Sequence, residues 1–346
     1  MSGPSTATVA ATAALRRIAF LLERAGEPTY RVKAFRTAAG VVDGLPPGDL
    51  ELRLGAATLT DLSGIGAVTA LAITEAAAGE TPVYLRRLEA TAGRPVAEGG
   101  AELRARLRGD LHTHSDWSDG GSPIREMAEA AIALGHSYLA LTDHSPRLTV
   151  ANGLTPARLR SQLDLVTGIN EELAPFRILT GIEVDILDDG GLDQEPELLD
   201  RLDIVVASVH SKLRMPSADM TRRMVVAAAN PHTDILGHCT GRMVTGNRHR
   251  PESEFDADLV FEACRQFGVA VEINSRPERL DPPKRLLRLA VEAGCRFSID
   301  TDAHAPGQLD WQPYGCERAA ACGVESGTVI NTLQVEELLA WTRRAR

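Results

Sequence analysis

The pattern of apolar and polar positions divides the chain into two parts. In residues 9 to 93, apolar side chains recur every three or four positions, which is the spacing of one buried helix face. The clearest run holds Leu15, Ile18, Ala19 and Leu22. Because glycine and proline turns interrupt this pattern, residues 9 to 93 are predicted to form a small all-α domain.

After residue 108 the pattern changes to short apolar, β-branched runs that alternate with helical stretches, as in parallel β-α units. The predicted strands are 111–114, 138–142, 178–184, 203–209, 234–237, 269–274 and 296–301. Seven such units favour an α/β fold over residues 109 to 346, a closed or nearly closed (βα)7 barrel of the TIM type. An open doubly wound sheet is the alternative, but no Gly-x-Gly-x-x-Gly loop follows the first strand.

Local signals mark a boundary and several helix starts. Residues 94 to 108 contain Pro95, Gly99 and Gly100 and are predicted to form a linker between the two domains. In the barrel, three helices are predicted to start where a capping side chain precedes a proline. These pairs are Ser122-Pro123, Thr155-Pro156 and Asp281-Pro282.

Composition limits the class of protein. The chain has 346 residues, 44% hydrophobic and 24% charged, so it can bury a full core and is too apolar to be disordered. The net charge of −10 argues against a protein coated in nucleic acid. Residues 1 to 108 hold 13 Lys and Arg against 11 Asp and Glu, whereas the remainder holds 24 against 36. The mildly basic residues 1 to 108 can bind phosphates, and the acidic remainder of the chain can bind cations.

Cysteine usage and hydropathy indicate the compartment. No apolar run approaches the roughly 20 residues that span a bilayer, and no signal-peptide pattern opens the chain. The five cysteines form no CxxC pair, which is typical of reduced, buried thiols. We therefore expect a cytoplasmic protein without a membrane partner.

Histidines and carboxylates gather at the carboxyl ends of the predicted strands, which form the active face of an α/β barrel. Residues two apart in a strand point the same way, so His112 with His114, and Asp302 with His304, can each hold one ion. The nine candidate ligands are His112, His114, Asp119, His144, Glu183, His210, His238, Asp302 and His304. For any one histidine, a buried side chain with ordinary hydrogen bonds is the alternative. Nine ligands fit three ions, because a catalytic zinc takes about three protein ligands.

The order of these motifs is recognisable. The series His-x-His, Asp, Thr-Asp-His-Ser, Gly-Ile-Glu, Ser-Val-His, His-x-Thr-Gly-Arg and Asp-x-His resembles the PHP (polymerase and histidinol phosphatase) family. It is most similar to the C-terminal PHP domain of bacterial family X DNA polymerases. The resemblance implies a distorted seven-stranded barrel and a trinuclear site of zinc, manganese or iron held by the nine residues above. Two departures are Cys239, where proline often stands, and the loop Ser275-Arg276-Pro277.

The N-terminal part resembles the corresponding region of family X polymerases. The stretches 15–20 and 30–36 are similar to its first helices, and Leu62-Ser63-Gly64-Ile65-Gly66 is similar to its helix-hairpin-helix turn. Two glycines let a hairpin backbone approach a phosphate, so Gly64, Ile65 and Gly66 are candidate DNA contacts. The short segment before the barrel leaves no room for a polymerase palm, and the single Lys33 makes an amine-based lyase doubtful.

These features predict a metal-dependent phosphoesterase. A hydroxide that bridges two ions is expected to attack phosphorus, because metal ions lower the pKa of bound water. Arg242 is the candidate bidentate clamp on the phosphate, with Arg276 and Lys212 as weaker candidates. Asp143, beside His144, is expected to orient a histidine or a water.

Several readings of function stay open at this stage. The substrate is a DNA 3′ end, as for a 3′-5′ exonuclease or 3′-phosphatase, or a small phosphomonoester such as histidinol phosphate. An amidohydrolase is disfavoured, because none of the three lysines lies inside a predicted strand. A barrel that has lost activity and serves as a DNA-binding scaffold is the alternative from another class.

Overall fold

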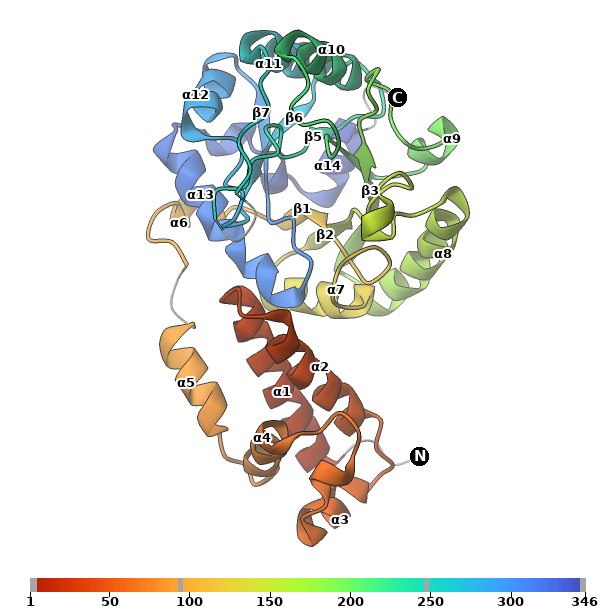
Figure 1. The fold of residues 1–346 in the computed structure, drawn as a ribbon, viewed down its shortest axis with the longest axis vertical. Coiled ribbons are helices and arrows are strands. Elements are labelled where there is room, and N and C mark those ends of the chain that lie inside the picture. Colours follow the sequence, from red (N-terminus) through yellow and green to blue (C-terminus); the bar gives the residue numbers. More distant parts are fainter. Residues whose placement is uncertain (1–4, 93–95, 246–248, 343–346) are drawn as a thin grey trace. The chain divides into compact units, whose positions relative to one another are not determined.

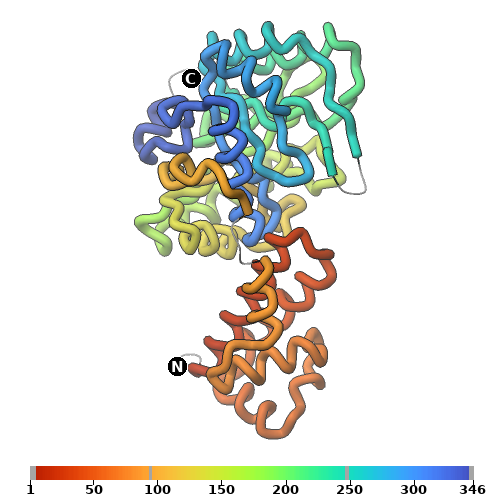
Figure 2. Tube along the Cα trace, turned by 90° about the vertical axis from the view of Figure 1, so that its left-hand side faces the viewer, coloured from red at the N-terminus to blue at the C-terminus, as the bar shows by residue number. Residues whose placement is uncertain are grey.

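The computed structural model describes residues 5–92, 96–245 and 249–342, and the chain divides into two compact units, Met1–Pro95 and Val96–Arg346. The first unit is drawn in red to orange, and the second continues to blue (Figure 1, Figure 2). Each unit has its own apolar core. The chain therefore separates into a helical unit and a barrel unit, as the change in sequence pattern indicates.

The helical unit packs its elements around one long helix. The helices are α1 (Thr6–Arg24), α2 (Thr29–Asp43), α3 (Asp49–Ala56), α4 (Ala67–Ala77) and α5 (Val83–Thr91), with a 3-10 turn at Leu59–Asp61. Helix α1 begins at a cap, because the Ser5 hydroxyl accepts a hydrogen bond from the Thr8 amide at 3.2 Å. Its apolar face, with Leu15, Ile18 and Leu22 fully buried, packs against α2, α4 and α5.

The barrel unit holds seven parallel strands that pair in chain order, each with the next. They are β1 (Gly109–Thr113), β2 (Tyr138–Leu141), β3 (Arg177–Asp185), β4 (Ile204–Ser208), β5 (Ile235–Leu236), β6 (Ala270–Asn274) and β7 (Arg296–Asp300). The helices are α6 (Ala101–Arg104), α7 (Ile124–Ala133), α8 (Pro156–Leu173), α9 (Pro196–Leu199), α10 (Ser217–Ala228), α11 (Ala257–Phe267), α12 (Lys284–Glu292), α13 (Gln312–Ala321) and α14 (Val335–Thr342). The prediction of a seven-stranded (βα) barrel is confirmed (Figure 1).

Side chains complete the closure between the first and last strands. The Leu111 amide donates to Asp300 Oδ1 at 2.8 Å, and the Thr301 hydroxyl donates to Asp110 Oδ2 at 2.6 Å. Further along, the His114 amide donates to the carbonyl oxygen of Ala303 at 2.8 Å. The ends of β1 and β7 are thereby joined at the edge where the candidate ligands follow both strands.

The predicted helix starts are confirmed in one case of three. The Thr155 hydroxyl caps α8 by accepting from the Arg158 amide, with a proline at the first helical position. Helix α7 instead begins at Ile124 without a side-chain cap, so the Ser122 prediction is wrong. The Asp281 prediction is also wrong: α12 begins at Lys284, and the Asp281 carboxylate accepts from Thr240 instead.

The segment predicted as a linker differs from that expectation. Helix α6 lies within it, and Leu103 and Leu107 are buried in the barrel core. Gly100 has φ +74°, and a Cβ there would lie 2.4 Å from the carbonyl carbon of Cys316. From Gly100 onward the chain therefore packs as part of the barrel unit.

Two further expectations concern surface and redox chemistry. All five cysteines are free and buried, as predicted. Among the residues that the structure describes, no helix has the length and apolar character needed to cross a bilayer.

Candidate metal centre

The nine candidate ligands converge at the carboxyl ends of the strands. Each lies within 3.6 Å of at least one other across a nitrogen–oxygen pair. The remaining histidines that the structure describes in detail bond elsewhere: His136 faces Arg104, and His232 faces Asp200. The strand-end pattern therefore brings together side chains that are up to 192 positions apart, from His112 to His304.

Glu183, from β3, lies at the middle of the cluster. Its Oε1 lies 2.9 Å from His238 Nε2 and 3.1 Å from His210 Nε2. Its Oε2 lies 2.9 Å from His144 Nδ1 and 3.3 Å from His112 Nε2. One carboxylate thus faces histidines from four other strand ends.

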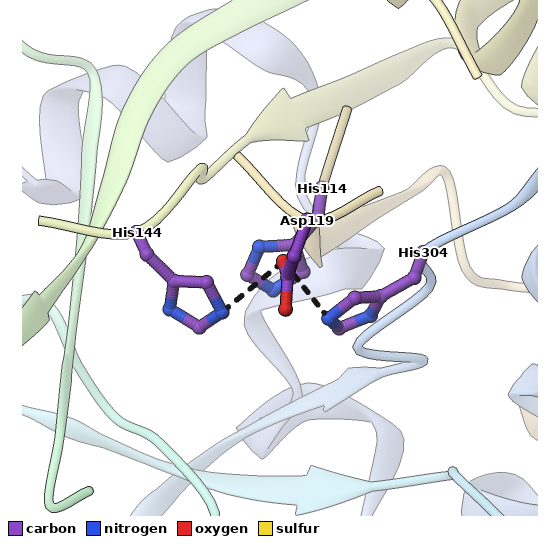
Figure 3. Close-up of side chains that lie close together, drawn as sticks. All are labelled: His114, Asp119, His144 and His304. Atoms are coloured by element: carbon purple, nitrogen blue, oxygen red, sulfur yellow. Dashed lines mark ion pairs between the residues drawn. The ribbon is translucent and has the colours of Figure 1, made fainter. Parts of the chain in front are cut away.

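A second group consists of His114, Asp119, His144 and His304, whose side chains lie close together (Figure 3). Asp119 Oδ1 lies 3.4 Å from His144 Nε2 and 3.3 Å from His304 Nε2. The His114 ring lies 4.2 Å from that of His304 and 4.5 Å from that of His144, between centroids. One donor atom from each of these four residues falls within 4.8 Å of the others, so they can share an ion.

The donor atoms fit divalent ions. Several ring nitrogens and one carboxylate oxygen are buried without a hydrogen-bond partner: His112 Nε2, both nitrogens of His114, His238 Nδ1 and Glu183 Oε2. Burying such groups unpaired costs free energy, and a metal ion would supply the missing partner. Imidazole and carboxylate donors suit zinc, manganese or iron. The residues present therefore fit the predicted metal centre, and they form three overlapping groups.

The carboxylates of the cluster are held ionised. Burial acts to raise the pKa of Glu183, but the charges of His210, His112 and His144 outweigh it and hold that pKa well below the usual value. Burial likewise acts to raise the pKa of Asp302, but the charge of Arg279, together with His114 and Arg276, holds that pKa well below its usual value. Both groups are therefore ready to bind a cation at neutral pH.

The histidines of the cluster differ from one another in pKa. Burial lowers the pKa of His114, and His304 and His144 lower it further, to about 3, so its ring is neutral. Burial also acts to lower the pKa of His144, but the charges of Glu183 and Asp119 raise it to about 10. An ion bound by His144 must displace a proton, so acid should weaken binding.

Two carboxylates that sequence reasoning missed support the ligands from outside. Glu272 Oε1 lies 2.6 Å from His112 Nδ1, and Asp185 Oδ1 lies 2.5 Å from His210 Nδ1. Asp185 stands two positions after Glu183 and shares its strand face, which is a signal the sequence offered. Such contacts fix which ring nitrogen faces the ion.

Asp143 differs from its expected role. Its carboxylate is fully buried and accepts hydrogen bonds from the Ser115 amide at 2.8 Å and the Ser115 hydroxyl at 2.6 Å. Gln162 Nε2 and the Ser118 hydroxyl supply two more donors. None of these partners is a histidine, so Asp143 instead fixes the loop between β1 and α7 that carries Asp119.

Arg242 also differs from its expected role as a phosphate clamp. Its Nε donates to the carbonyl oxygen of Arg279 at 3.0 Å, and its Nη2 donates to that of Leu280. Its Nη1 lies 3.4 Å from Glu252 Oε1. All three guanidinium nitrogens are therefore engaged, and the side chain braces the loop after β6.

Lys212 and Arg276, the two weaker candidates for binding the substrate phosphate, lie in different surroundings. Lys212 Nζ forms an ion pair with Asp188 on an exposed loop, which does not match its predicted contact with the substrate phosphate. Arg276 Nη1, by contrast, lies 3.3 Å from His304 Nδ1 and 3.8 Å from Asp302 Oδ1. Of the two, Arg276 borders the ligand cluster.

Arg279 is a cation that sequence reasoning missed. Its Nε lies 3.0 Å from Asp302 Oδ2, and its Nη1 is buried without a hydrogen-bond partner. No spacing rule marks this position, because the loop that carries it turns through Leu280 at φ +47°. A guanidinium beside a ligand carboxylate, with neither Nε nor Nη1 in a hydrogen bond, can receive an anionic oxygen.

The three candidate DNA contacts in the hairpin of the helical unit have different surroundings in the structure. Gly64 has φ +91°, and a Cβ there would lie 2.7 Å from Thr37 Cγ2, so glycine is needed for packing. Ile65 is only 5% exposed and belongs to the helical core, which removes its side chain from the candidate contacts. Gly66 is exposed and precedes α4, and its amide donates to the Thr69 hydroxyl.

Fold and site together define a class of protein: an α/β-barrel hydrolase of phosphate esters with a histidine-rich metal centre. The family model of the PHP domain matches residues 110–276, and that of a helix-hairpin-helix domain matches residues 9–81. The chain belongs to the PHP family.

Two sequence relatives agree with this assignment. The DNA polymerase/3′-5′ exonuclease PolX of Bacillus subtilis (strain 168) is 42% identical over 238 residues, which cover 69% of this chain and 41% of that protein. A probable phosphatase of Thermoanaerobacter sp. (strain X514) is 30% identical over 64% of this chain and 89% of its own length. A solved histidinol phosphate phosphatase of Lactococcus lactis has a TM-score of 0.44 at 18% identity, covering 64% of this chain and 94% of that one. The chain spans less than half of the Bacillus relative.

Proposed function

We propose that this chain hydrolyses phosphate esters at a site of three divalent ions, with DNA 3′ ends among its substrates. The observation that carries this proposal is the position of Glu183, which faces histidines from four other strand ends. Buried, unpartnered donor atoms around it support metal binding. Three ions would be held by the nine predicted ligands.

The ions would supply Lewis-acid charge and lower the pKa of a water that attacks phosphorus. Three divalent ions against Asp119, Glu183 and Asp302 leave a net charge of about +3, so an acidic barrel can still attract an anion. The nine ligands, which lie at the strand ends, would hold this positive charge at the carboxyl end of the barrel. No side-chain nucleophile is required.

Arg279 and Arg276 are the residues best placed to receive the substrate phosphate. Both approach Asp302, with nitrogen–oxygen distances of 3.0 and 3.8 Å. The unpaired Nη1 of Arg279 can donate to a non-bridging oxygen, and Arg276 lies on the side of His304. Arg242 contributes by fixing the backbone of Arg279.

The helical unit supports a DNA substrate. Its hairpin is exposed at Gly64 and Gly66, and the amino-terminal end of α4 follows directly. The Bacillus relative carries 3′-5′ exonuclease in its name, although this chain covers only 41% of it. A small phosphomonoester is the second candidate substrate, favoured by the match to 89% of the length of a probable phosphatase.

One experiment separates these functions. Purified protein with manganese or zinc is offered p-nitrophenyl phosphate, histidinol phosphate and 3′-labelled DNA, and kcat/KM is compared. A preference for the DNA 3′ end supports the proposal, and a preference for histidinol phosphate supports the small-molecule alternative. Metal content well below one ion per chain, with no hydrolysis, would favour the inactive scaffold. A cytoplasmic location stays a prediction of the sequence.

A further inference from the structure

Glu272 lies in β6, the one barrel strand that supplies none of the nine proposed ligands. The strand reads Ala-Val-Glu-Ile-Asn, and its carboxylate is fully buried. A buried carboxylate is costly unless donors surround it. Its position in an otherwise apolar stretch therefore calls for a specific set of partners.

Two of those partners are proposed ligands, and the third contacts another ligand. Glu272 Oε1 lies 2.6 Å from His112 Nδ1, and Oε2 accepts the backbone N–H of His238. Asn274 Nδ2 lies 3.3 Å from Glu272 Oε2 and also 3.3 Å from Asp302 Oδ2. One carboxylate thus links ligand-bearing segments from β1, β5 and β7.

The first contact fixes the protonation pattern of a ligand. An ionised carboxylate only accepts hydrogen bonds, so Nδ1 of His112 must carry the proton. A ring that binds an ion has lost its second proton, so its lone pair would lie on Nε2, which faces Glu183 Oε2 at 3.3 Å. This is the tautomer that can bind an ion beside Glu183.

We infer that Glu272 is a positioning residue that sets the affinity of the ion bound by His112. It acts through the His112 tautomer and through the backbone at His238, and it touches neither ion nor substrate. The inference rests on the proposed metal centre and deepens it. It also assigns a role to β6, which supplies none of the nine proposed ligands.

The substitution Glu272→Gln tests this role with little change in shape. An amide has one acceptor and one donor end, whereas His112 Nδ1–H and the His238 N–H both need acceptors. Either orientation of glutamine therefore leaves one of the two contacts unmade. The loss of a carboxylate that hydrogen-bonds a metal ligand typically lowers metal affinity. We therefore expect about 10- to 100-fold weaker binding of one ion.

The measurement is a titration of the metal-depleted full chain with zinc, in competition with a chelator, and separately with manganese. We expect the rise in Tm on adding metal to be smaller than in the wild type, whatever the Tm without metal, and excess metal to restore kcat. The matched control is Glu262→Gln, because Glu262 pairs with Arg265 on the exposed face of α11. That variant should bind metal like the wild type.

Three results would overturn the inference. The first is equal metal affinity in Glu272→Gln and wild type. The second is an equal fall in Tm with and without metal, which marks a purely structural role. If the glutamine variant does not fold, Glu272→Asp replaces it, because the shorter aspartate side chain cannot reach both partners. The third result is a metal affinity of Glu272→Asp equal to that of the wild type. A wild-type chain that binds no metal instead overturns the proposed function itself.

Discussion

Arg242 donates a hydrogen bond from Nε to the carbonyl oxygen of Arg279 at 3.0 Å, so one arginine holds the backbone of another. The held residue then reaches Asp302 with its own guanidinium at 3.0 Å. The two arginines therefore have different effects when changed. Arg279 should act on substrate binding directly, and Arg242 through the loop that carries it.

We expect Arg279→Ala to lower kcat/KM by about 100-fold, chiefly through KM, because a phosphate oxygen loses its donor. Arg242→Lys should lower kcat/KM by about tenfold or less, because a lysine can replace only part of the contacts to the loop. Steady-state kinetics with p-nitrophenyl phosphate at saturating metal compare the two. A larger loss in Arg242→Lys than in Arg279→Ala would return the clamp to Arg242.

Glu183→Gln should abolish phosphatase activity, with a loss of at least about 1,000-fold in kcat. The glutamine keeps the shape of the side chain but removes the charge that faces four histidines. Metal content measured on the same sample should fall as well. Near wild-type turnover with the full metal content would show that Glu183 is not a bridging ligand.

The contrast between these residues shows what the sequence could predict. The nine ligands follow strand ends, and strand ends are visible as the last residues of apolar runs, so their convergence was predictable. Glu272 was hidden because it interrupts an apolar strand without a motif of its own. Arg279 was hidden because its direction depends on a loop that turns through Leu280 at φ +47° and accepts a hydrogen bond from Arg242.

One of the two failed helix-start predictions has a related reason. A capping residue before proline is a local signal, and it holds at Thr155, whose hydroxyl accepts from the Arg158 amide. At Asp281, the hydroxyl and amide of Thr240 compete for the same carboxylate and win. Tertiary contacts of this kind are not encoded in local spacing.

The barrel closure predicts a pH-dependent difference in stability. Burial, followed by the charge of Glu272, raises the pKa of Asp300 from 3.8 to about 6, and its Oδ2 has no hydrogen-bond partner. A carboxyl whose pKa is higher in the folded than in the unfolded state loses stability as pH rises through that interval. Asp300→Asn removes this loss while its amide oxygen can still accept from Leu111.

We therefore expect the free energy of unfolding of Asp300→Asn to rise relative to wild type between pH 4 and pH 6, by about 1 to 3 kcal/mol, and then to level off. Urea unfolding of both proteins at matched metal content, at several pH values, measures this difference. A difference that stays constant from pH 4 to pH 8 would contradict the assignment.

The hairpin of the helical unit offers a matched pair of glycines for testing DNA binding. A Cβ at Gly64 would meet Thr37 at 2.7 Å with φ +91°, so Gly64→Ala should destabilise this unit by about 1 to 3 kcal/mol. At Gly66 nothing lies within 4 Å and φ is −97°, so alanine fits there without strain. Gly66→Ala therefore tests the surface and not the fold.

If the backbone at Gly66 approaches a DNA phosphate, the added methyl group should weaken DNA binding several-fold while phosphatase activity on p-nitrophenyl phosphate stays unchanged. Wild-type affinity should fall with rising salt, with a log–log slope of about −2 to −4 for a few phosphate contacts. Fluorescence anisotropy with a labelled duplex at several salt concentrations measures both quantities. Equal DNA affinity in Gly66→Ala and wild type would place the contact elsewhere, and no measurable DNA binding by the wild type would favour the small phosphomonoester as substrate.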